Sequence, residues 1–298
     1  MRELNDILQR LEPVLGPASG EPRPLHGGIT NRNYRVALGG VEYVLRVHGA
    51  RTQLLGIDRD AERQANDAAA RLGIAPAVAA SLEGCLVTRY VPCRALTSEE
   101  VAARAEEIAR ALRAFHDSGA QLGHRFWVPE LLDDYERELR LRGAAPGEDF
   151  ARAVAAARRI ARALPLRDPR PCHNDLLAGN IICEAQAGRL LLVDWEYAGM
   201  GHRLFDLGNL AVNNGFDSDA QQRLLSAYLD RPADAGARAA LELMRVLSDA
   251  REAAWGALQA RISALDFDFR SYARSHFERL HAAVARPEFE EWLGAAQG

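Results

Sequence analysis

The sequence predicts an α+β protein in which a small antiparallel sheet is followed by a larger, mainly helical part. Short apolar runs separated by turn residues dominate residues 1–92, whereas apolar residues recur at three and four positions through most of residues 93–298. The length of 298 residues corresponds to two domains, or to one large domain in two lobes, at about 150 residues per domain. We therefore expect an N-terminal lobe over 1–92 and a C-terminal lobe over 93–298.

The predicted N-terminal lobe contains a small sheet and one helix. Two strands are expected at 29–38 and 41–47, because the Gly-Gly pair between them is typical of a tight hairpin turn. A helix is expected over 58–72, where the apolar spacing is helical and a glycine follows. A further strand is expected over 85–91, and a proline ends it.

The predicted C-terminal lobe begins with a helix. Thr97 and Glu100 have the spacing of a capping box, and the helical pattern after them continues to Gly119. A second helix, rich in alanine and arginine, is expected over 149–164. The remaining elements are a β-hairpin of strands 180–183 and 190–195, and helices beyond Phe205 with interruptions at Gly215, Pro232 and Phe267.

The composition excludes several classes of function. The 37 basic residues are all arginine, and with 41 acidic residues they leave a formal net charge of −4. A chain without lysine cannot form a lysine Schiff base, use a lysine as general base or carry a P-loop that ends in Gly-Lys-Ser/Thr. Any cationic phosphate ligand must therefore be an arginine. No basic stripe dominates, which argues against a nucleic-acid or anionic-membrane partner.

Cysteine usage and the N-terminal residues indicate a soluble, cytoplasmic protein. The four cysteines include no C-x-x-C pair, so neither a disulfide framework nor a zinc site is expected. Residues 1–15 carry charges among their apolar positions and lack the apolar segment of a signal peptide. No uncharged apolar run approaches the length of about 18 residues that a membrane-spanning helix requires.

The most informative motif lies at residues 173–180, His-Asn-Asp-Leu-Leu-Ala-Gly-Asn, which match H-x-D-x-x-x-x-N. Phosphoryl transfer requires a carboxylate that accepts the hydroxyl proton, here Asp175, and an amide oxygen and a second carboxylate that hold Mg²⁺ on the phosphates. The predicted hairpin would bring Asn180 and Asp194 to one edge, within reach of one metal ion. His173 is interpreted as a residue that braces the loop, because Asp175 already provides the base.

Two further elements are candidate phosphate ligands. Gly28, Thr30 and Asn31 lie at a predicted turn, where backbone N–H groups and short polar side chains could cover a triphosphate. The alternative is that the glycines only form a turn. Arg46 lies among apolar residues of a predicted strand, and Glu62 in the next helix is its expected partner, as in the strand–helix ion pair of protein kinases. The alternative for Arg46 is a purely structural cation.

Several motifs resemble the choline/ethanolamine kinase family of the aminoglycoside-phosphotransferase superfamily. Residues 194–197 (Asp-Trp-Glu-Tyr) and 205–209 (Phe-Asp-Leu-Gly-Asn) are similar to motifs of that family, and residues 27–31 resemble its nucleotide loop. An arginine such as Arg46, where protein kinases use lysine, is usual in choline kinases. Residues 255–263 are similar to the segment that supplies choline-binding aromatics. The resemblance covers most of the chain and implies a protein-kinase-like, two-lobed fold.

The resemblance also implies an ATP-dependent phosphotransferase that uses Mg²⁺ and acts on the primary alcohol of a small molecule. The N-terminal lobe would bind the nucleotide, and the C-terminal lobe would carry the catalytic loop and the acceptor pocket. Asp175 would be the base, Asn180 and Asp194 the magnesium ligands, and Asp206 a support of the catalytic loop. The nucleotide would contact Gly28, Thr30, Asn31, Arg46, Glu62 and the backbone of Tyr90 and Val91.

The acceptor implied by the resemblance is an amino alcohol, with choline as the leading substrate and ethanolamine beside it. A quaternary ammonium has no N–H to donate, so aromatic faces and a nearby carboxylate are the means of holding it. Trp255, Tyr272 and Glu196 would supply them. The alternative is that Trp255 and Tyr272 are core aromatics at helical spacing.

Two departures from the family pattern concern the acceptor pocket. Glu252 stands where a second cage tryptophan is expected, and we interpret it as a replacement for a missing negative charge. Asn213 and Asn214 occupy the neighbourhood where the family often has a carboxylate. Aminoglycosides, thiamine-like alcohols and other small alcohols are therefore alternative acceptors, and a nucleotide-binding pseudokinase is the alternative without catalysis.

Other enzyme classes lack their motifs here. The eight histidines form no H-x-H or H-x-x-x-H pair of the kind expected in a metal-dependent hydrolase, and no G-x-S-x-G elbow is present for a serine hydrolase. A non-enzymatic interaction protein would not need a base, metal ligands and a phosphate clamp together. The sequence makes no prediction of the oligomeric state.

Overall fold

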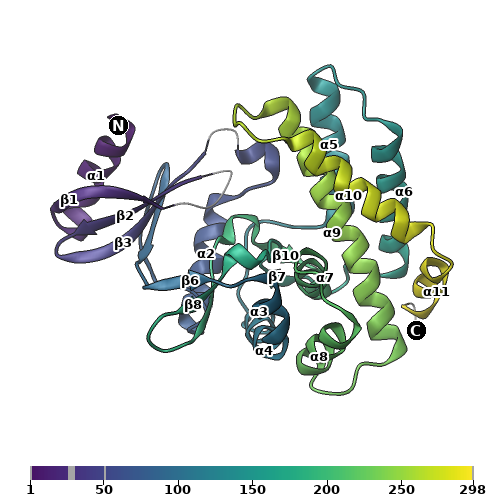
Figure 1. The fold of residues 1–298 in the computed structure, drawn as a ribbon. Helices are drawn as coiled ribbons and strands as arrows, with labels where there is room; N and C mark the ends of the chain where they lie inside the picture. The colour runs from purple at the N-terminus through teal and green to yellow at the C-terminus, as the bar shows by residue number, and fades with distance from the viewer. Residues whose placement is uncertain (1, 26–30, 50–51, 297–298) are drawn as a thin grey trace.

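The structure is a computed structural model that describes residues 2–25, 31–49 and 52–296. Figure 1 shows a sheet with helix α1 on one side of the molecule and a larger helical body, with α9 running through it, on the other. The predicted α+β class, with an antiparallel N-terminal sheet and a mainly helical C-terminal part, is confirmed. The boundary expected between residues 92 and 93 stays a prediction.

The N-terminal sheet has five antiparallel strands in the order β1-β2-β3-β5-β4. Alternation along the central strand β3 divides its side chains between two faces. Leu45 and Val47 are buried in a core shared with helix α1, whereas Val44 and Arg46 line a cavity on the other face. The bounds are α1 Arg2–Leu15, β1 Ala18–Leu25, β2 Arg32–Leu38, β3 Val41–Val47, β4 Val78–Leu82 and β5 Cys85–Arg89.

The outer strands β1 and β4 have no counterpart among the predicted elements. Both lie at an edge of the sheet, and β1 contains Gly20, Pro22 and Pro24, residue types that are usual at edges and bulges. The predicted inner strands β2, β3 and β5 are confirmed, although the first residues of the expected strand 29–38 lie outside the described residues.

Helix α2 (Arg59–Arg71) confirms the predicted helix and links the two parts of the molecule. Its N-cap Asp58 accepts a hydrogen bond from the helix backbone at 2.9 Å, and Gly73, with a φ of 75°, follows its C-terminal end. The buried alanines of α2 belong to the same apolar cluster as Leu192 and Trp195 of the C-terminal part. The helix therefore packs on the C-terminal part as well as on the sheet.

The predicted hairpin is confirmed as strands β8 (Ile181–Glu184) and β9 (Leu190–Leu192). A third strand, β6 (Cys93–Ala95), pairs with β8 and was not expected from the sequence. A separate two-stranded sheet consists of β7 Arg170–Cys172 and β10 Gly199–Gly201.

Helix α9 is the central element of the helical part, and α5, α6, α7, α10 and α11 pack against it (Figure 1). The prediction of one helix from Thr97 to Gly119 is wrong, because two helices meet at Arg104. The Arg104 backbone leaves the helical region, and its guanidinium donates to the carbonyl of Gly188 in the hairpin turn at 2.9 Å. The bounds are α3 Ser98–Ala103, α4 Ala105–His116, α5 Val128–Leu141, α6 Glu148–Ala163, α7 Arg203–Asn213, α8 Ser218–Leu229, α9 Ala235–Ile262, α10 Phe269–Val284 and α11 Glu288–Ala295.

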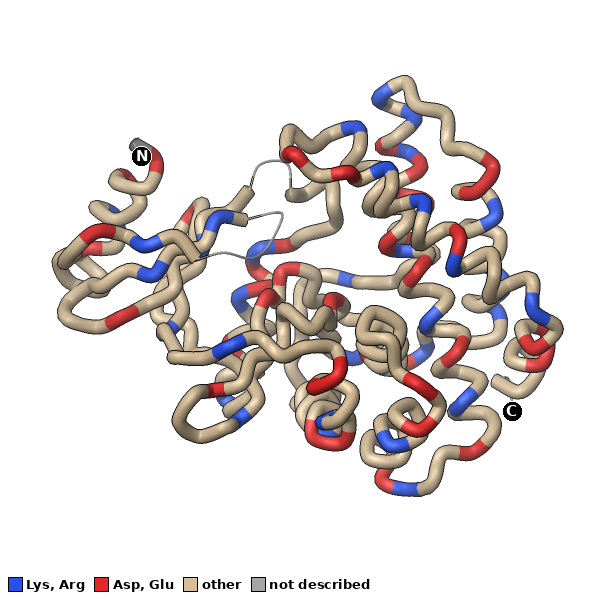
Figure 2. Tube along the Cα trace, viewed as in Figure 1, with Lys and Arg blue, Asp and Glu red and all other residues tan. Residues whose placement is uncertain are grey.

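Charged residues of both signs are spread over both parts of the molecule, as Figure 2 shows. Many of them form arginine–carboxylate pairs one helical turn apart, such as Arg140 with Glu136 and Arg152 with Glu148. Within the described residues, no helix combines the length and the apolar character needed to cross a lipid bilayer.

Candidate active site

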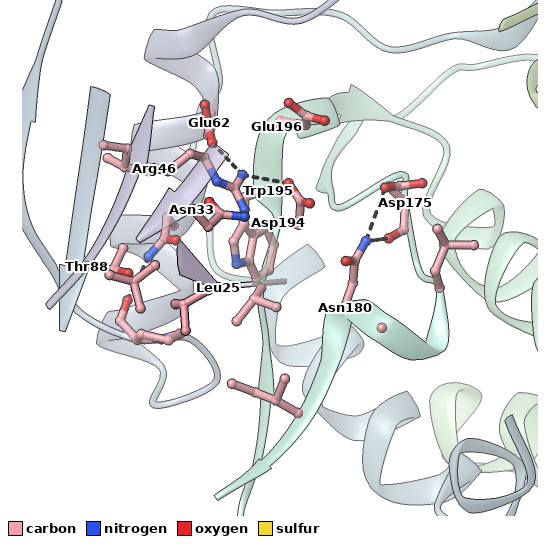
Figure 3. Close-up of a pocket in the computed structure, with 18 of the residues that line it drawn as sticks. Leu25, Asn33, Arg46, Glu62, Thr88, Asp175, Asn180, Asp194, Trp195 and Glu196 are labelled. Atoms are coloured by element: carbon pink, nitrogen blue, oxygen red, sulfur yellow. Dashed lines mark hydrogen bonds and ion pairs between the residues drawn. The ribbon is translucent and has the colours of Figure 1, made fainter. Parts of the chain in front are cut away.

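A cavity of about 590 Å³ lies between the N-terminal sheet and the β8–β9 hairpin. Figure 3 shows Arg46 on the sheet side, Asp194 after β9, and Asn180 beside Asp175. The fold thus brings the predicted base, the predicted metal ligands and the predicted phosphate clamp to one cavity.

The predicted catalytic loop, residues 173–180, is held by hydrogen bonds that its backbone donates to helix α7. The Asp206 carboxylate accepts the backbone N–H groups of His173 at 2.8 Å and Asn174 at 2.7 Å, and it lies 3.0 Å from Nε2 of His116. Burial acts to raise the pKa of Asp206, but the hydrogen bond from His116 and the bond from the His173 backbone hold it below its usual value. Asp206 is therefore placed where the sequence expects a support of the loop.

Two asparagines of the same helix region extend this support. Asn209 Oδ1 accepts the backbone N–H of Leu176 at 2.5 Å, and Asn214 Nδ2 donates to the Leu176 carbonyl at 3.0 Å. A Cβ at Gly208 would lie 2.6 Å from Met244, so α7 can approach α9 this closely only at a glycine. Asn214, a departure from the family pattern, thus contacts the catalytic loop, a position that the sequence did not predict.

Both ring nitrogens of His173 make hydrogen bonds, one within the loop and one to the residue after β9. Nδ1 accepts the Asp175 backbone N–H at 3.3 Å, and Nε2 lies 2.9 Å from the Val193 carbonyl, which requires Nε2 to be the donor. The ring packs on Trp195 at a centroid distance of 4.5 Å, and burial lowers the pKa of His173. These contacts support the interpretation of His173 as a neutral bracing residue.

Asn180 and Asp194 offer oxygen ligands to the cavity. Asn180 Nδ2 donates to the backbone carbonyl of Asp175 at 2.8 Å and to its carboxylate at 3.1 Å, which turns the Asn180 oxygen away from Asp175 (Figure 3). Asp194 has a φ of 67°, a left-handed conformation that is uncommon outside glycine and concentrates at functional sites. Amide and carboxylate oxygens are ligands that Mg²⁺ prefers, so the residues fit the metal expected from the sequence.

Arg46 joins the sheet to helix α2 and to the hairpin. Its Nη1 lies 3.0 Å from Glu62 Oε1, which is the expected ion pair, and 2.6 Å from Asp194 Oδ1. Burial acts to lower the pKa of Arg46, but the Asp194 and Glu62 carboxylates outweigh it and raise the pKa. Arg46 therefore stays charged beside the expected metal ligand.

A second group of polar contacts crosses between the two parts and was not predicted. Arg59 Nη1 donates to Glu62 at 2.7 Å and to Glu196 at 3.3 Å, while its Nη2 donates to Asn31 Oδ1 at 3.1 Å. Asn31 Nδ2 in turn donates to Glu196 at 2.7 Å. Asn31, which we expect to contact the nucleotide, is thus hydrogen-bonded to Glu196, which we expect to contact the acceptor.

Tyr90 and Val91, whose backbone is the expected adenine contact, both line the cavity. The Tyr90 backbone N–H donates to the Glu42 carbonyl at 3.1 Å and is therefore already used. The backbone groups left for the expected adenine contact are the Tyr90 carbonyl and those of Val91. Gly28 and Thr30, also expected at the nucleotide, lie outside the described residues. Apolar side chains that also line the cavity are Leu25, Val44, Leu86, Ile182 and Val193.

The expected acceptor residues form two layers. Trp255 lines the cavity together with Tyr197, and its N–H donates to the Tyr197 hydroxyl at 2.8 Å. Tyr272 and Glu252 are not among the described residues that line the cavity. Tyr272 packs on the Trp255 ring and donates its hydroxyl to Glu252 at 2.7 Å. Glu252 also accepts from Arg251 at 2.6 Å, so its charge is compensated within the protein, which corrects its interpretation as a direct replacement for a pocket charge.

Asp175, the predicted base, lies near several charged side chains. Burial holds the pKa of Asp175 well above its usual range, while Arg251 acts to lower the pKa, and Glu252 and Asp194 act to raise it. Arg251 Nη1 lies 3.7 Å from Asp175 Oδ1. Neither Arg251 nor Arg59 belongs to a motif that the sequence singles out.

Two known proteins are similar in sequence to this chain. The protein LicA of Haemophilus influenzae is 28% identical over 216 residues, which cover 69% of this chain and 62% of LicA. The ethanolamine kinase of Drosophila melanogaster is 28% identical over 286 residues, which cover 82% of this chain. This chain spans 54% of the length of the Drosophila protein.

The fold is shared with a solved structure along its whole length. A choline/ethanolamine kinase family protein from Mesorhizobium loti has a TM-score of 0.82 and 29% identity, with 99% of each chain covered. A sequence model of the phosphotransferase enzyme family matches residues 21–244. The resemblance predicted from the motifs is confirmed, and the chain belongs to the phosphotransferase enzyme family.

Proposed function

We propose that this protein transfers the γ-phosphate of ATP to the primary hydroxyl of a small amino alcohol, with choline and ethanolamine as the acceptors. The observation that carries the proposal is the juxtaposition of Asp175, Asn180 and Asp194 at one cavity, with Arg46 bonded to Asp194. The N-terminal lobe binds the nucleotide and the C-terminal lobe binds the acceptor. Two of the similar proteins, an ethanolamine kinase and a choline/ethanolamine kinase family protein, support the choice of acceptor.

Asp175 is the general base in this reaction. It orients the acceptor hydroxyl and accepts its proton while the hydroxyl oxygen bonds to the γ-phosphorus and the bond from that phosphorus to ADP breaks. Asn180, which donates two hydrogen bonds to Asp175, fixes the orientation of the carboxylate. Magnesium, when held by Asn180 and Asp194, would neutralise the charge that develops on the phosphates.

The charge of the site suits a cationic acceptor. Among the described residues that line the cavity, four carry a carboxylate and three a guanidinium, so an acceptor ammonium offsets the remaining negative charge. The charged side chains that line it are the carboxylates of Glu62, Asp175, Asp194 and Glu196 and the guanidiniums of Arg46, Arg89 and Arg251.

The test is ADP release from Mg·ATP in the presence of choline, ethanolamine, thiamine or kanamycin, with Asp175→Asn as the blank. Turnover with choline or ethanolamine that is lost in the variant supports the proposal. Turnover with thiamine or kanamycin alone keeps the mechanism and replaces the acceptor. ATP binding without turnover on any alcohol would identify a pseudokinase instead.

A further inference from the structure

Arg251 is a buried cation beside the proposed base. It lies on helix α9 and is only 2% exposed. One nitrogen, Nη1, lies 2.6 Å from Glu252 and 3.7 Å from Asp175, and the guanidinium carbon lies 4.1 Å from the centre of the Tyr197 ring. The other two nitrogens, Nε and Nη2, are buried without a hydrogen-bond partner among the described residues.

The surroundings of Arg251 are those that a bound ammonium needs. A cation held by a protein is stabilised by an aromatic face and by nearby carboxylates. The guanidinium covers one face of Tyr197 and lies between the carboxylates of Glu252 and Asp175. The protein's own side chain therefore occupies a position that an acceptor ammonium would otherwise take.

The remaining aromatic surface near Asp175 is small. Trp255 is 6% exposed, and its ring is packed edge-on against Phe269 and Tyr272 at centroid distances of 5.7 Å. A quaternary ammonium, which has no N–H to donate, depends on such aromatic faces. A primary ammonium has three N–H donors and can bind to the carboxylates and carbonyls of the site without an aromatic face.

We propose that Arg251 is a specificity-determining residue: it fills the cation position at Tyr197, so the enzyme selects amino alcohols whose nitrogen carries N–H over quaternary ones. This inference rests on the proposed phosphotransfer to an amino alcohol. It names the class of acceptor, a small amino alcohol whose ammonium keeps at least one N–H, and the side chain that selects it. Glu252 takes part by holding the guanidinium in place.

The test measures kcat/KM for ethanolamine and its mono-, di- and trimethylated forms, the last of which is choline. In the wild-type enzyme kcat/KM is expected to fall along the series, by about 10-fold to 100-fold in total, the range in which one small group changes a pocket's discrimination. The double variant Arg251→Met/Glu252→Gln removes both charges of the pair together, so that Glu252 is not left as an unpaired buried charge. It is expected to raise the choline-to-ethanolamine ratio of kcat/KM by about 10-fold.

Two further variants keep the result interpretable. Arg251→Lys retains the cation and is expected to retain the preference for ethanolamine, which tests the inference even where the double variant does not fold. Arg261→Gln removes an exposed charge from the last turn of the same helix and is expected to leave the ratio unchanged. The ratio compares two acceptors in one preparation, so a merely structural defect, which lowers the active fraction, does not move it.

The outcomes separate this inference from the proposed function. No turnover of any member of the series would overturn both. Turnover in which choline equals or exceeds ethanolamine, or a double variant whose ratio matches the wild type, would overturn the role of Arg251 and leave phosphotransfer to amino alcohols in place.

Discussion

The catalytic loop and the phosphate clamp face the same cavity but are held in different ways. The loop is fixed within the C-terminal part, because Asp206 and Asn209 accept its backbone N–H groups. The clamp is fixed between the two parts by ion pairs, in which Arg46 reaches Asp194 and Arg59 reaches Glu196. The geometry of the loop is therefore determined within the helical part. The geometry of the clamp depends on the position of the sheet relative to the hairpin, and on ligands that bind to the same guanidiniums.

The largest effect is expected at the base. Asp175→Asn keeps the size of the side chain but removes the proton acceptor, so kcat should fall about 1000-fold, within the range that general bases contribute. Because the loop is held by other residues, nucleotide affinity should change by less than about 3-fold, which is about 0.7 kcal/mol. Steady-state turnover and calorimetric titration with Mg·ATP measure the two quantities.

Asp219→Asn is a suitable control, since that carboxylate is 81% exposed on the outer surface of α8. An Asp175→Asn variant that retains most of its kcat would show that the proton is accepted elsewhere.

The next effect is a loss of stability at the loop support. Asp206→Asn replaces a fully buried carboxylate that accepts two backbone N–H groups and faces His116. Hydrogen bonds to a buried charged group are each stabilising by about 1.5–3 kcal/mol, so the free energy of unfolding should fall by about 3 kcal/mol. Urea unfolding measures this change. An unchanged unfolding midpoint would show that the loop does not depend on Asp206.

A smaller effect, of a different kind, is expected at the clamp. Arg46→Lys keeps the positive charge, but the lysine side chain is one bond shorter than the reach to Nη1, the nitrogen that contacts both Glu62 and Asp194, and it lacks the planar fork that binds phosphate oxygens. The KM for ATP should rise about 10-fold, equivalent to about 1.4 kcal/mol, while the unfolding free energy changes by less than about 1 kcal/mol. Equal losses of unfolding free energy in Arg46→Lys and Asp206→Asn would contradict this difference between the loop and the clamp.

The loop was predictable from the sequence because its residues lie in short motifs. Asp175 and Asn180 are five residues apart, and the hairpin that carries Asp194 follows directly. The ion pair of Arg46 and Glu62 was predictable for a similar reason, since a strand and the next helix carry them. Local pattern and spacing suffice where contacting residues are close in sequence or belong to one motif.

The contacts that the sequence did not predict join residues far apart in the chain. Arg59 and Glu196 are separated by 137 positions, and neither position has a hydropathy pattern that indicates a contact. Arg251 lies on a helix that is buried on most sides, so its charge there has no periodic signal. The edge strands β1 and β4 were missed because they lack the alternation of apolar residues that marks a half-buried strand. Such features are determined by tertiary packing.

The smallest predicted effect concerns pH and the helix that carries Asp206. His202 caps α7: its Nδ1 accepts the Leu204 backbone N–H at 3.3 Å, and burial, followed by the charge of Arg203, lowers the pKa of His202 to about 4. The unfolded chain, with an ordinary histidine pKa, binds more protons between those two values, so this contribution to stability is complete above about pH 6.5 and decreases as the pH falls toward 4.

His202→Asn tests this contribution, because asparagine is a good N-cap that does not titrate in this range. Between about pH 7.5 and pH 5.5, the wild-type protein should lose about 1 kcal/mol more unfolding free energy than the variant, a value reduced for the partial exposure of His202. Urea unfolding of both proteins at the two pH values gives the difference directly. Equal losses would mean that His202 is protonated in the folded state as readily as in the unfolded chain, and that the start of α7 does not couple the loop support to pH.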